Sequence, residues 1–337
     1  MAIDVHAHYL PPGIIDVLSE RGRTFGIELL EVAPACHCIH FDYGVRVRPT
    51  FPRLVEDAAA RMDAMSATGI QRQVLSMWAD VFGYGLPIDQ GSAWHRLLND
   101  KLAEFCNGEP KHFSFLASGP LQDGGAAARE LERGVRELGA VGGMVAANIE
   151  GRNLGEADLD EYWAAAVELN VPIFIHPTQP VPLERTARFA LNQIIQYSTD
   201  TTLSVGSLMF AGVLDRFAGL RLILSHGGGT LPWLIGRFDC MHGRMDRDAM
   251  GNVAEKTPSA YLERFWYDTI LHDGGALRYL AEMVGTGRLV LGSDDPFPPM
   301  DRDPLASLRA AGYSDADMDM ITSRTRATCS GCLRRIE

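Results

Sequence analysis

Two histidines stand two residues apart in the first apolar run of the chain. Residues 2–9 read Ala-Ile-Asp-Val-His-Ala-His-Tyr, which places His6 and His8 on alternate positions. Alternate residues of a β-strand point to the same face, so a strand here would present two imidazoles side by side. Such a pair can supply two ligands to one metal ion. Two half-buried histidines at the start of a strand would give the same pattern.

Three more titratable side chains lie at the ends of apolar runs further along the chain. His176 ends Val-Pro-Ile-Phe-Ile-His, His226 ends Leu-Ile-Leu-Ser-His, and Asp294 follows Leu-Val-Leu-Gly-Ser. A single residue of this kind is more often a core or capping group than a ligand. Their convergence with the first pair, from four different strands, favours a metal site.

Eight strand-like runs alternate with helix-like stretches along the chain. The predicted strands are 2–9, 73–78, 113–118, 141–147, 171–176, 221–226, 265–271 and 289–292, and the predicted helices are 54–68, 92–107, 126–138, 159–169, 201–217 and 275–284. This order predicts an α/β fold, a (β/α)8 TIM barrel with its active site at the C-terminal ends of the strands. We expect one barrel domain over 1–337. A small antiparallel flap at 11–52 follows the first strand, with short β-like runs at 27–32, 38–41 and 44–47.

Composition narrows the class of protein and its partners. The 337 residues are 46% hydrophobic and 22% charged, with a net charge of −12. The absence of a basic stripe argues against nucleic acid as a partner. No apolar run is long enough to span a membrane, and a first strand at residue 2 leaves no room for a signal peptide. These features predict a cytoplasmic protein with reduced cysteines.

Two groups of cysteines could suggest metal or redox chemistry. Cys36 and Cys38 alternate with histidines in Cys-His-Cys-Ile-His, and Cys329 and Cys332 form a C-x-x-C pair near the C-terminus. The first spacing matches no common zinc module, and the second lacks a thioredoxin-like context. We interpret the first group as part of a hairpin in the flap and the second as incidental.

The motifs around the candidate ligands resemble those of the amidohydrolase superfamily (amidohydrolase family 2). More narrowly, they resemble the branch that contains 2-amino-3-carboxymuconate-6-semialdehyde decarboxylase. The matching stretches are His6-Ala-His8-Tyr-Leu-Pro, Phe174-Ile-His176-Pro, Ser225-His226-Gly-Gly-Gly-Thr-Leu-Pro-Trp-Leu-Ile-Gly-Arg237, Leu271-His272-Asp273 and Leu291-Gly-Ser-Asp294-Asp-Pro-Phe-Pro298. The resemblance runs nearly from end to end of the chain.

The resemblance implies a role for each candidate ligand. In that family His6, His8, His176 and Asp294 would bind one divalent ion, usually zinc, with a water completing the shell. His226 would hydrogen-bond the water and act with Asp294 in catalysis. Three imidazoles and one carboxylate leave a positive site suited to activating water, and His226 can accept and return its proton.

The residues also bear on the number of metal ions. Binuclear members of the superfamily use a carboxylated lysine on the fourth strand. Here that strand reads Val-Gly-Gly-Met-Val-Ala-Ala-Asn over 141–148, without lysine. One divalent ion, zinc by the resemblance, is therefore expected.

The family's use of arginines to hold substrate carboxylates suggests further site residues. Arg46 or Arg48 fits the arginine from the flap, and Arg247 or Arg244 fits one donated by a neighbouring subunit, which predicts a homodimer with shared sites. A guanidinium is a natural clamp for a carboxylate, although each of these arginines could equally be a solvated surface charge. Phe297 could line the pocket.

Three departures from the family pattern suggest a different substrate. Thr178 stands where the decarboxylase has Trp, and Asp295 stands where it has Tyr, which would add a negative charge near the metal. The C-terminal element is altered over 325–331.

These observations leave three functions open. The first is a metal-dependent, non-oxidative decarboxylase of a small conjugated or aromatic carboxylic acid. The second is a metal-dependent hydrolase of an amide, lactone or C–C bond, or a hydratase, using the same metal-activated water. The third, a non-catalytic metal-binding barrel, would leave a full ligand set and a base idle. Release of carbon dioxide separates the first from the second.

Overall fold

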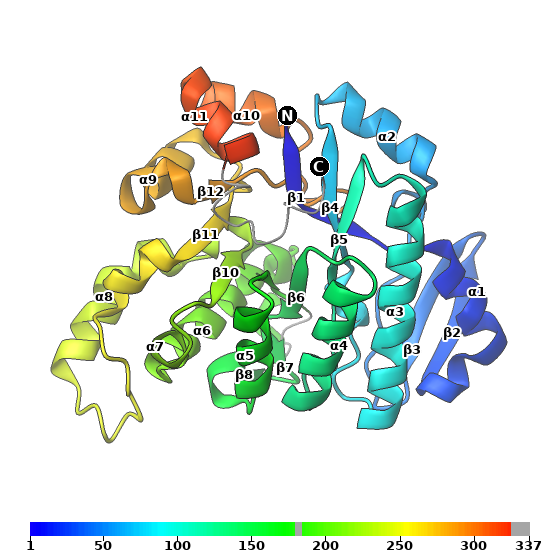
Figure 1. Ribbon diagram of the computed structural model, residues 1–337, viewed down its shortest axis with the longest axis horizontal. Helices are drawn as coiled ribbons and strands as arrows, with labels where there is room; N and C mark the ends of the chain where they lie inside the picture. The colour runs from blue at the N-terminus through cyan, green and yellow to red at the C-terminus, as the bar shows by residue number, and fades with distance from the viewer. Residues whose placement is uncertain (179–183, 325–337) are drawn as a thin grey trace.

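Eight parallel strands form one sheet around the centre of the molecule (Figure 1). The computed structural model describes residues 1–178 and 184–324. In spatial order the strands are β1 (Ile3–Tyr9), β4 (Arg72–Met77), β5 (Phe113–Ala117), β6 (Gly142–Ala146), β9 (Pro172–His176), β10 (Arg221–Leu224), β11 (Phe265–Asp268) and β12 (Leu289–Val290). Val5 N–H donates to Leu291 O at 2.9 Å and His8 N–H to Asp295 O at 2.7 Å. These bonds join the first strand to the last, so the sheet closes as the predicted (β/α)8 barrel.

Helices cover the outer side of the strands (Figure 1). They are α1 (Pro12–Arg21), α2 (Ala58–Ala67), α3 (Ile88–Gly108), α4 (Gly124–Arg136), α5 (Asp160–Glu168), α6 (Tyr197–Phe210), α7 (Val213–Arg216), α8 (Leu231–Arg244), α9 (Gly274–Val284), α10 (Pro304–Ala310) and α11 (Asp315–Asp319). All eight predicted strands are found, and the fold class is confirmed. The helices α1, α8, α10 and α11 were not predicted.

Local signals explain where two predicted helices end differently. The helix expected over 54–68 begins at Ala58, because Asp57 caps it by accepting from Ala60 N–H at 2.8 Å. A side-chain oxygen at this position satisfies a backbone donor that the first turn leaves unpaired. The helix expected over 201–217 divides into α6 and α7 because Gly212, with φ +67°, takes the left-handed conformation between them.

The insertion after β1 contains the expected hairpin. Strands β2 (Ile27–Ala33) and β3 (Cys36–Phe41) pair antiparallel, with Leu29 opposite Ile39. Helix α1 precedes the hairpin, and the predicted run at 44–47 is reduced to an isolated bridge between His40 and Arg46. Cys36 and Cys38 lie in the hairpin as free thiols, whereas Cys329 and Cys332 lie outside the described residues.

The interior of the barrel is closely packed and directs selected side chains to one end. Every residue of β4, β5, β6 and β9 is buried. In β1 the pairing with β4 shifts register between Asp4 and Ala7, and a shift of this kind changes the direction of side chains locally.

A further small hairpin, β7 (Asn148–Ile149) and β8 (Arg152–Asn153), follows β6. In the described part of the chain, no helix combines the length and apolar composition needed to cross a membrane.

Candidate metal centre and substrate cavity

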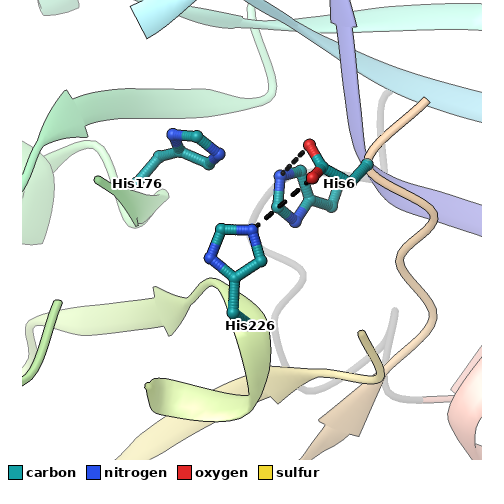
Figure 2. A group of neighbouring side chains, drawn as sticks. His6, His176 and His226 are labelled. Carbon is teal, nitrogen blue, oxygen red and sulfur yellow. Dashed lines mark ion pairs between the residues drawn. The ribbon is translucent and has the colours of Figure 1, made fainter. Parts of the chain in front are cut away.

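Five titratable side chains converge at the C-terminal ends of the strands. His6 and His8 project from β1, His176 ends β9, His226 follows β10, and Asp294 follows β12. Figure 2 shows the imidazoles of His6, His176 and His226 directed toward a common centre from separate elements. The structure therefore brings together all the residues that the sequence nominated for the metal site and its base.

Three of these groups form a compact triangle of donor atoms. His6 Nε2 lies 3.0 Å from His8 Nε2, and Asp294 Oδ1 lies 3.4 Å from His6 Nε2 and 3.2 Å from His8 Nε2. Ligands about 2.1 Å from a tetrahedral ion stand roughly 3.4 Å apart, and an octahedral arrangement brings them closer. Two imidazole lone pairs at this separation require a proton or a cation between them. The spacing therefore fits a divalent ion.

Unpaired buried atoms support the same conclusion. His176 Nε2 is buried without a hydrogen-bond partner among the described residues, and the buried Asp294 Oδ1 has the two long imidazole contacts given above. An unsatisfied buried polar atom is costly, so each indicates a ligand. One donor atom each from His6, His176, His226 and Asp294 lies within 4.8 Å of the others. Imidazole and carboxylate are common ligands of zinc and related ions.

Four ligands can be chosen from the five side chains in more than one way. The group within 4.8 Å includes His226 and omits His8, whereas the family resemblance predicts His8 as a ligand and His226 as a base. His8 is fully buried, and its Nε2 is closer to Asp294 than that of His226, which lies 3.6 Å from Asp294 Oδ2. His226 is partly exposed to the adjoining cavity. The ligand role of His8 and the base role of His226 remain predictions.

Outer hydrogen bonds orient the imidazoles. His8 Nδ1 lies 3.1 Å from Ser76 Oγ, and His176 Nδ1 lies 2.5 Å from Pro177 O. The backbone carbonyl can only accept, so His176 carries a proton on Nδ1 and leaves Nε2 free to bind a cation. Partners of this kind fix the tautomer and orientation of metal-binding histidines.

Asp268, at the end of β11, contacts both His6 of β1 and the turn that carries His226. Its Oδ2 lies 2.6 Å from His6 Nδ1 and accepts from His226 N–H at 2.9 Å, while Oδ1 accepts from Gly227 N–H at 2.9 Å. His226 and Gly227 both have φ near +60°, at +53° and +60°. This conformation is unfavourable for a residue with a side chain. The carboxylate therefore stabilises the unusual turn that presents His226.

The pKa shifts of three side chains in the cluster favour the protonation states that bind a cation. Burial lowers the pKa of His8 to about 4, assisted by the charges of neighbouring histidines, and burial also holds the pKa of His176 well below its usual value. Burial alone would raise the pKa of Asp294, but its contacts with His226 and His6 hold it well below its usual range. Neutral imidazoles and an ionised carboxylate are the forms that bind metals.

In the metal-free protein the pKa of His6 is raised, whereas those of His8 and His176 are lowered. Burial alone would lower its pKa, but the hydrogen bonds to Asp268 and Asp294 raise it to about 10. A proton on His6 Nε2 would then occupy the position next to Asp294 that a cation would take. Metal binding must displace that proton, which couples metal affinity to pH.

A cavity of about 490 Å³ opens directly beside the cluster. His176, His226 and Asp294 form part of its lining, together with Arg48 and Phe297. The guanidinium of Arg48 lies 5.0 Å from the centre of the Phe297 ring and 5.3 Å from that of Trp78. Cation–π contacts of this kind hold the charge at the wall of the cavity. Arg48 and Phe297, two of the residues that the sequence nominated for substrate binding, therefore line the cavity, and their role toward a substrate remains a prediction.

Two other arginines that the sequence nominated for substrate binding have different surroundings. Arg46 and Arg247 are exposed and are not among the described residues that line the cavity. Arg247 donates instead to Ala254 O in the segment after α8. Their roles in substrate binding remain predictions.

The expectation that Asp295 adds charge near the metal is wrong. Its carboxylate turns behind the Asp294 segment, where Oδ1 accepts from Arg53 at 2.7 Å and Oδ2 lies 3.2 Å from Arg61. Both arginines neutralise it. The backbone at Asp294 is not extended, since its φ is +62°, and the two neighbouring carboxylates contact different groups: Asp294 the histidines of the cluster, and Asp295 the two arginines.

Two acidic residues at the site were not singled out in the sequence. Asp268 interrupts the apolar run Phe-Trp-Tyr-Asp at the end of β11, and Asp80 follows β4 by three residues. Both have the signal that identified the metal ligands, a titratable residue at the C-terminal end of a barrel strand. Applying that signal to all eight strands would have found both residues.

The barrel and its polar end define a class of protein in which a (β/α)8 fold carries a histidine- and aspartate-rich metal site. The chain belongs to the amidohydrolase family, whose sequence profile matches residues 3–325. The resemblance drawn from the motifs is therefore confirmed.

Curated relatives and solved structures extend this comparison. The chain is 30% identical over 303 residues to 2-amino-3-carboxymuconate-6-semialdehyde decarboxylase of Dictyostelium discoideum, covering 88% of this chain and 82% of that protein. It is 28% identical over 318 residues to 6-methylsalicylic acid decarboxylase of Penicillium expansum, covering 93% and 89%.

Two solved structures share the fold. The 5-carboxyvanillate decarboxylase of Sphingomonas paucimobilis has a TM-score of 0.83 at 22% identity, covering 98% of this chain and 99% of that one. The dihydroxybenzoic acid decarboxylase of Polaromonas sp. JS666, with bound manganese and the inhibitor 2-nitroresorcinol, has a TM-score of 0.78 at 22% identity, covering 99% and 97%.

Proposed function

We propose that this protein is a metal-dependent, non-oxidative decarboxylase of a small conjugated or aromatic carboxylic acid. The observation that carries the proposal is the position of the metal-type cluster, which opens into a cavity walled by aromatic rings and one arginine. The curated relatives in the same family, which match the chain nearly end to end, are decarboxylases of a muconate semialdehyde and of 6-methylsalicylic acid.

The proposed ligands of one divalent ion are His6, His8, His176 and Asp294. A bound ion would supply positive charge to stabilise the negative charge that develops on the substrate. Three imidazoles and a carboxylate suit zinc, which we propose as the metal, although the Polaromonas enzyme binds manganese. Elemental analysis of the active protein decides between the two.

The chain's own residues supply binding and proton transfer. Arg48 would orient the substrate through its guanidinium, and the rings of Trp78 and Phe297 would hold a planar acid and exclude water. Cleavage of the bond to the carboxylate releases carbon dioxide and leaves an electron pair on the adjacent carbon. A proton must bind to that electron pair, and His226 lies at the wall of the cavity, where it would hold and deliver one.

The test is release of carbon dioxide from a panel of hydroxylated and conjugated carboxylic acids, followed together with the mass of the product. Metal-loaded protein should release carbon dioxide without oxygen or an organic cofactor, and chelation should abolish the release. If every substrate that turns over retains its carboxyl groups and instead gains water, a hydrolase or hydratase replaces this proposal. Full activity without metal, or two ions per active chain, would contradict the proposed site.

We also infer that the chain acts as a homodimer. An apolar groove of about 830 Å³ between α6 and α8 shares Thr230 and Trp233 with the substrate cavity. Leu203 and Trp233 are more than half exposed along it, at 56% and 58%. Exposed apolar surface next to a site supports association there. Arg247 follows α8 beside this groove, so a partner's Arg247 is our candidate for the arginine that completes the cavity.

A further inference from the structure

A second carboxylate lines the substrate cavity at some remove from the metal cluster. Asp80 lies just after β4 and is 8% exposed, and it and Asp294 are the two carboxylates among the described residues of the lining. A carboxylate buried to this degree costs free energy unless charge and hydrogen bonds compensate it. Its position at the C-terminal end of a barrel strand is where substrate-contacting residues lie in this fold.

Two other segments of the chain hold Asp80 in place. Thr178, which follows β9, donates from Oγ1 to Asp80 Oδ1 at 3.1 Å. A guanidinium nitrogen of Arg48 lies 3.6 Å from Oδ2, an ion pair longer than a hydrogen bond. Arg48 is itself held over the rings of Trp78 and Phe297. The carboxylate of Asp80 and the guanidinium of Arg48 therefore lie side by side, and both residues line the cavity.

We propose that Asp80 forms a specificity subsite that accepts a hydrogen bond from a hydroxyl or amino substituent of the substrate and disfavours a second carboxylate. The proposal rests on the proposed function in that it takes the cavity to bind a carboxylic acid. A carboxylate can only accept hydrogen bonds, so the neighbouring substrate group must be a donor. Arg48, next to it, remains the group that takes the acid.

The charges in the cavity support the preference for a monoanion. A divalent ion and Arg48 bring three positive charges, and Asp294 and Asp80 bring two negative charges. Asp268, bonded to His6 outside the lining, adds a further negative charge. Asp80 therefore lowers by one the positive charge that the lining offers a ligand, which disfavours a second carboxylate. In a cavity of low dielectric this difference is large enough to select between ligands.

The competing explanation is that Asp80 only holds Arg48 in position. The two explanations differ in which ligands are affected. A subsite for a donor group affects hydroxylated ligands and spares their methoxy counterparts, which have no proton to donate. An effect through Arg48 weakens all carboxylic acids by the same factor.

The experiment measures binding by calorimetry to the metal-loaded protein in a His226→Ala background, which suppresses turnover. The probes are 2-, 3- and 4-hydroxybenzoate, each paired with its methoxybenzoate, and isophthalate as a dianion. They are titrated into the Asp80 protein and into the variants Asp80→Asn and Asp80→Val. Arg48→Gln is the control for a general loss of carboxylate binding. Thermal melting and circular dichroism establish that each variant is folded, and the near-isosteric Asp80→Asn decides alone if Asp80→Val is not.

With Asp80 present, at least one hydroxybenzoate should bind about tenfold more tightly than its methoxy partner, the size expected for a hydrogen bond to a buried charged acceptor. That ratio should shrink in Asp80→Asn and approach one in Asp80→Val, while isophthalate gains affinity in both. Equal ratios in all proteins, or no hydroxylated probe that binds better than its partner, would overturn the proposal. So would a uniform loss across all probes like that of Arg48→Gln. Because binding is measured without turnover, failure of the decarboxylase assay leaves this result independent.

Discussion

Replacing Asp268 by asparagine is expected to weaken metal binding and to disturb His226 at the same time. The carboxylate accepts at Oδ2 from His226 N–H at 2.9 Å and pairs there with His6 Nδ1 at 2.6 Å. At Oδ1 it accepts from the N–H groups of Gly227 at 2.9 Å and Ile270 at 3.2 Å. An amide of the same shape offers one oxygen and one NH2 group, so one side of this arrangement must face a donor.

The magnitude follows from the tautomer of His6. If the new NH2 group faces His6 Nδ1, that nitrogen must accept, and the ring proton moves to Nε2, which points at the metal position. Binding of a metal ion at Nε2 then requires the ring proton to return to Nδ1, where it would face the new NH2 group, and this is unfavourable. Loss of an outer partner of a metal-binding histidine typically lowers affinity by about 10- to 100-fold, or about 1.4 to 2.8 kcal/mol. The backbone turn at His226 loses an acceptor in the same change.

The assay is competition for zinc with a chelator of known affinity, combined with kcat at saturating zinc. Glu130→Gln is a matched control, because Glu130 is also a buried carboxylate, at 6% exposure, bound to Asn99 and Arg133 far from the site. We expect Asp268→Asn to lower both affinity and kcat, and the control to lower neither. Recovery of full kcat at saturating zinc would refute the link to His226, and unchanged affinity would refute the argument on His6.

Three further predictions follow from the site. His226→Ala should retain most of its metal and lose activity by about 100-fold or more, whereas His176→Ala should lose its metal; equal metal loss in the two would make His226 a ligand. Inactive Arg247→Ala and Asp294→Ala subunits should regain activity when mixed, because one of the two sites in a hybrid dimer is intact, and no recovery after demonstrated subunit exchange would argue against a shared site. In the metal-free protein the pKa of His6 is raised from 6.5 to about 10, its carboxylate partners outweighing the opposing effect of burial. The stability this contributes is complete below pH 6.5 and is lost as the pH rises through 10. Melting temperatures of the metal-free protein that do not fall over this range would contradict the protonated form of His6.

The barrel could be predicted because each strand is a short buried apolar run between turn residues. The ligands could be predicted for a related reason, since His176, His226 and Asp294 stand where those runs end. Helix α8 was missed because an exposed Trp233 and an internal Gly236 interrupt its apolar stripe, the pattern that identifies a surface helix.

The two candidate arginines of the flap show what the sequence alone could not decide. Arg46 and Arg48 would share a face if residues 44–47 formed a strand. The segment has one isolated bridge, from Arg46 to His40, and beyond it Arg48 turns over the aromatic wall of the cavity. Contacts with Trp78 and Phe297, which come from distant parts of the chain, place Arg48 at the cavity.

The two aspartates misjudged from the sequence show how the barrel divides its negative charge. Asp295 was expected beside the metal, but Arg53 and Arg61 neutralise it behind the loop. It therefore anchors the segment that carries Asp294 rather than acting on a ligand. Asp80 went unnoticed, yet it lines the cavity with Arg48 beside it. The sequence analysis expected the extra negative charge beside the metal, at Asp295; the structure instead has a carboxylate on the cavity wall, at Asp80, where we propose that it bears on the choice of ligand.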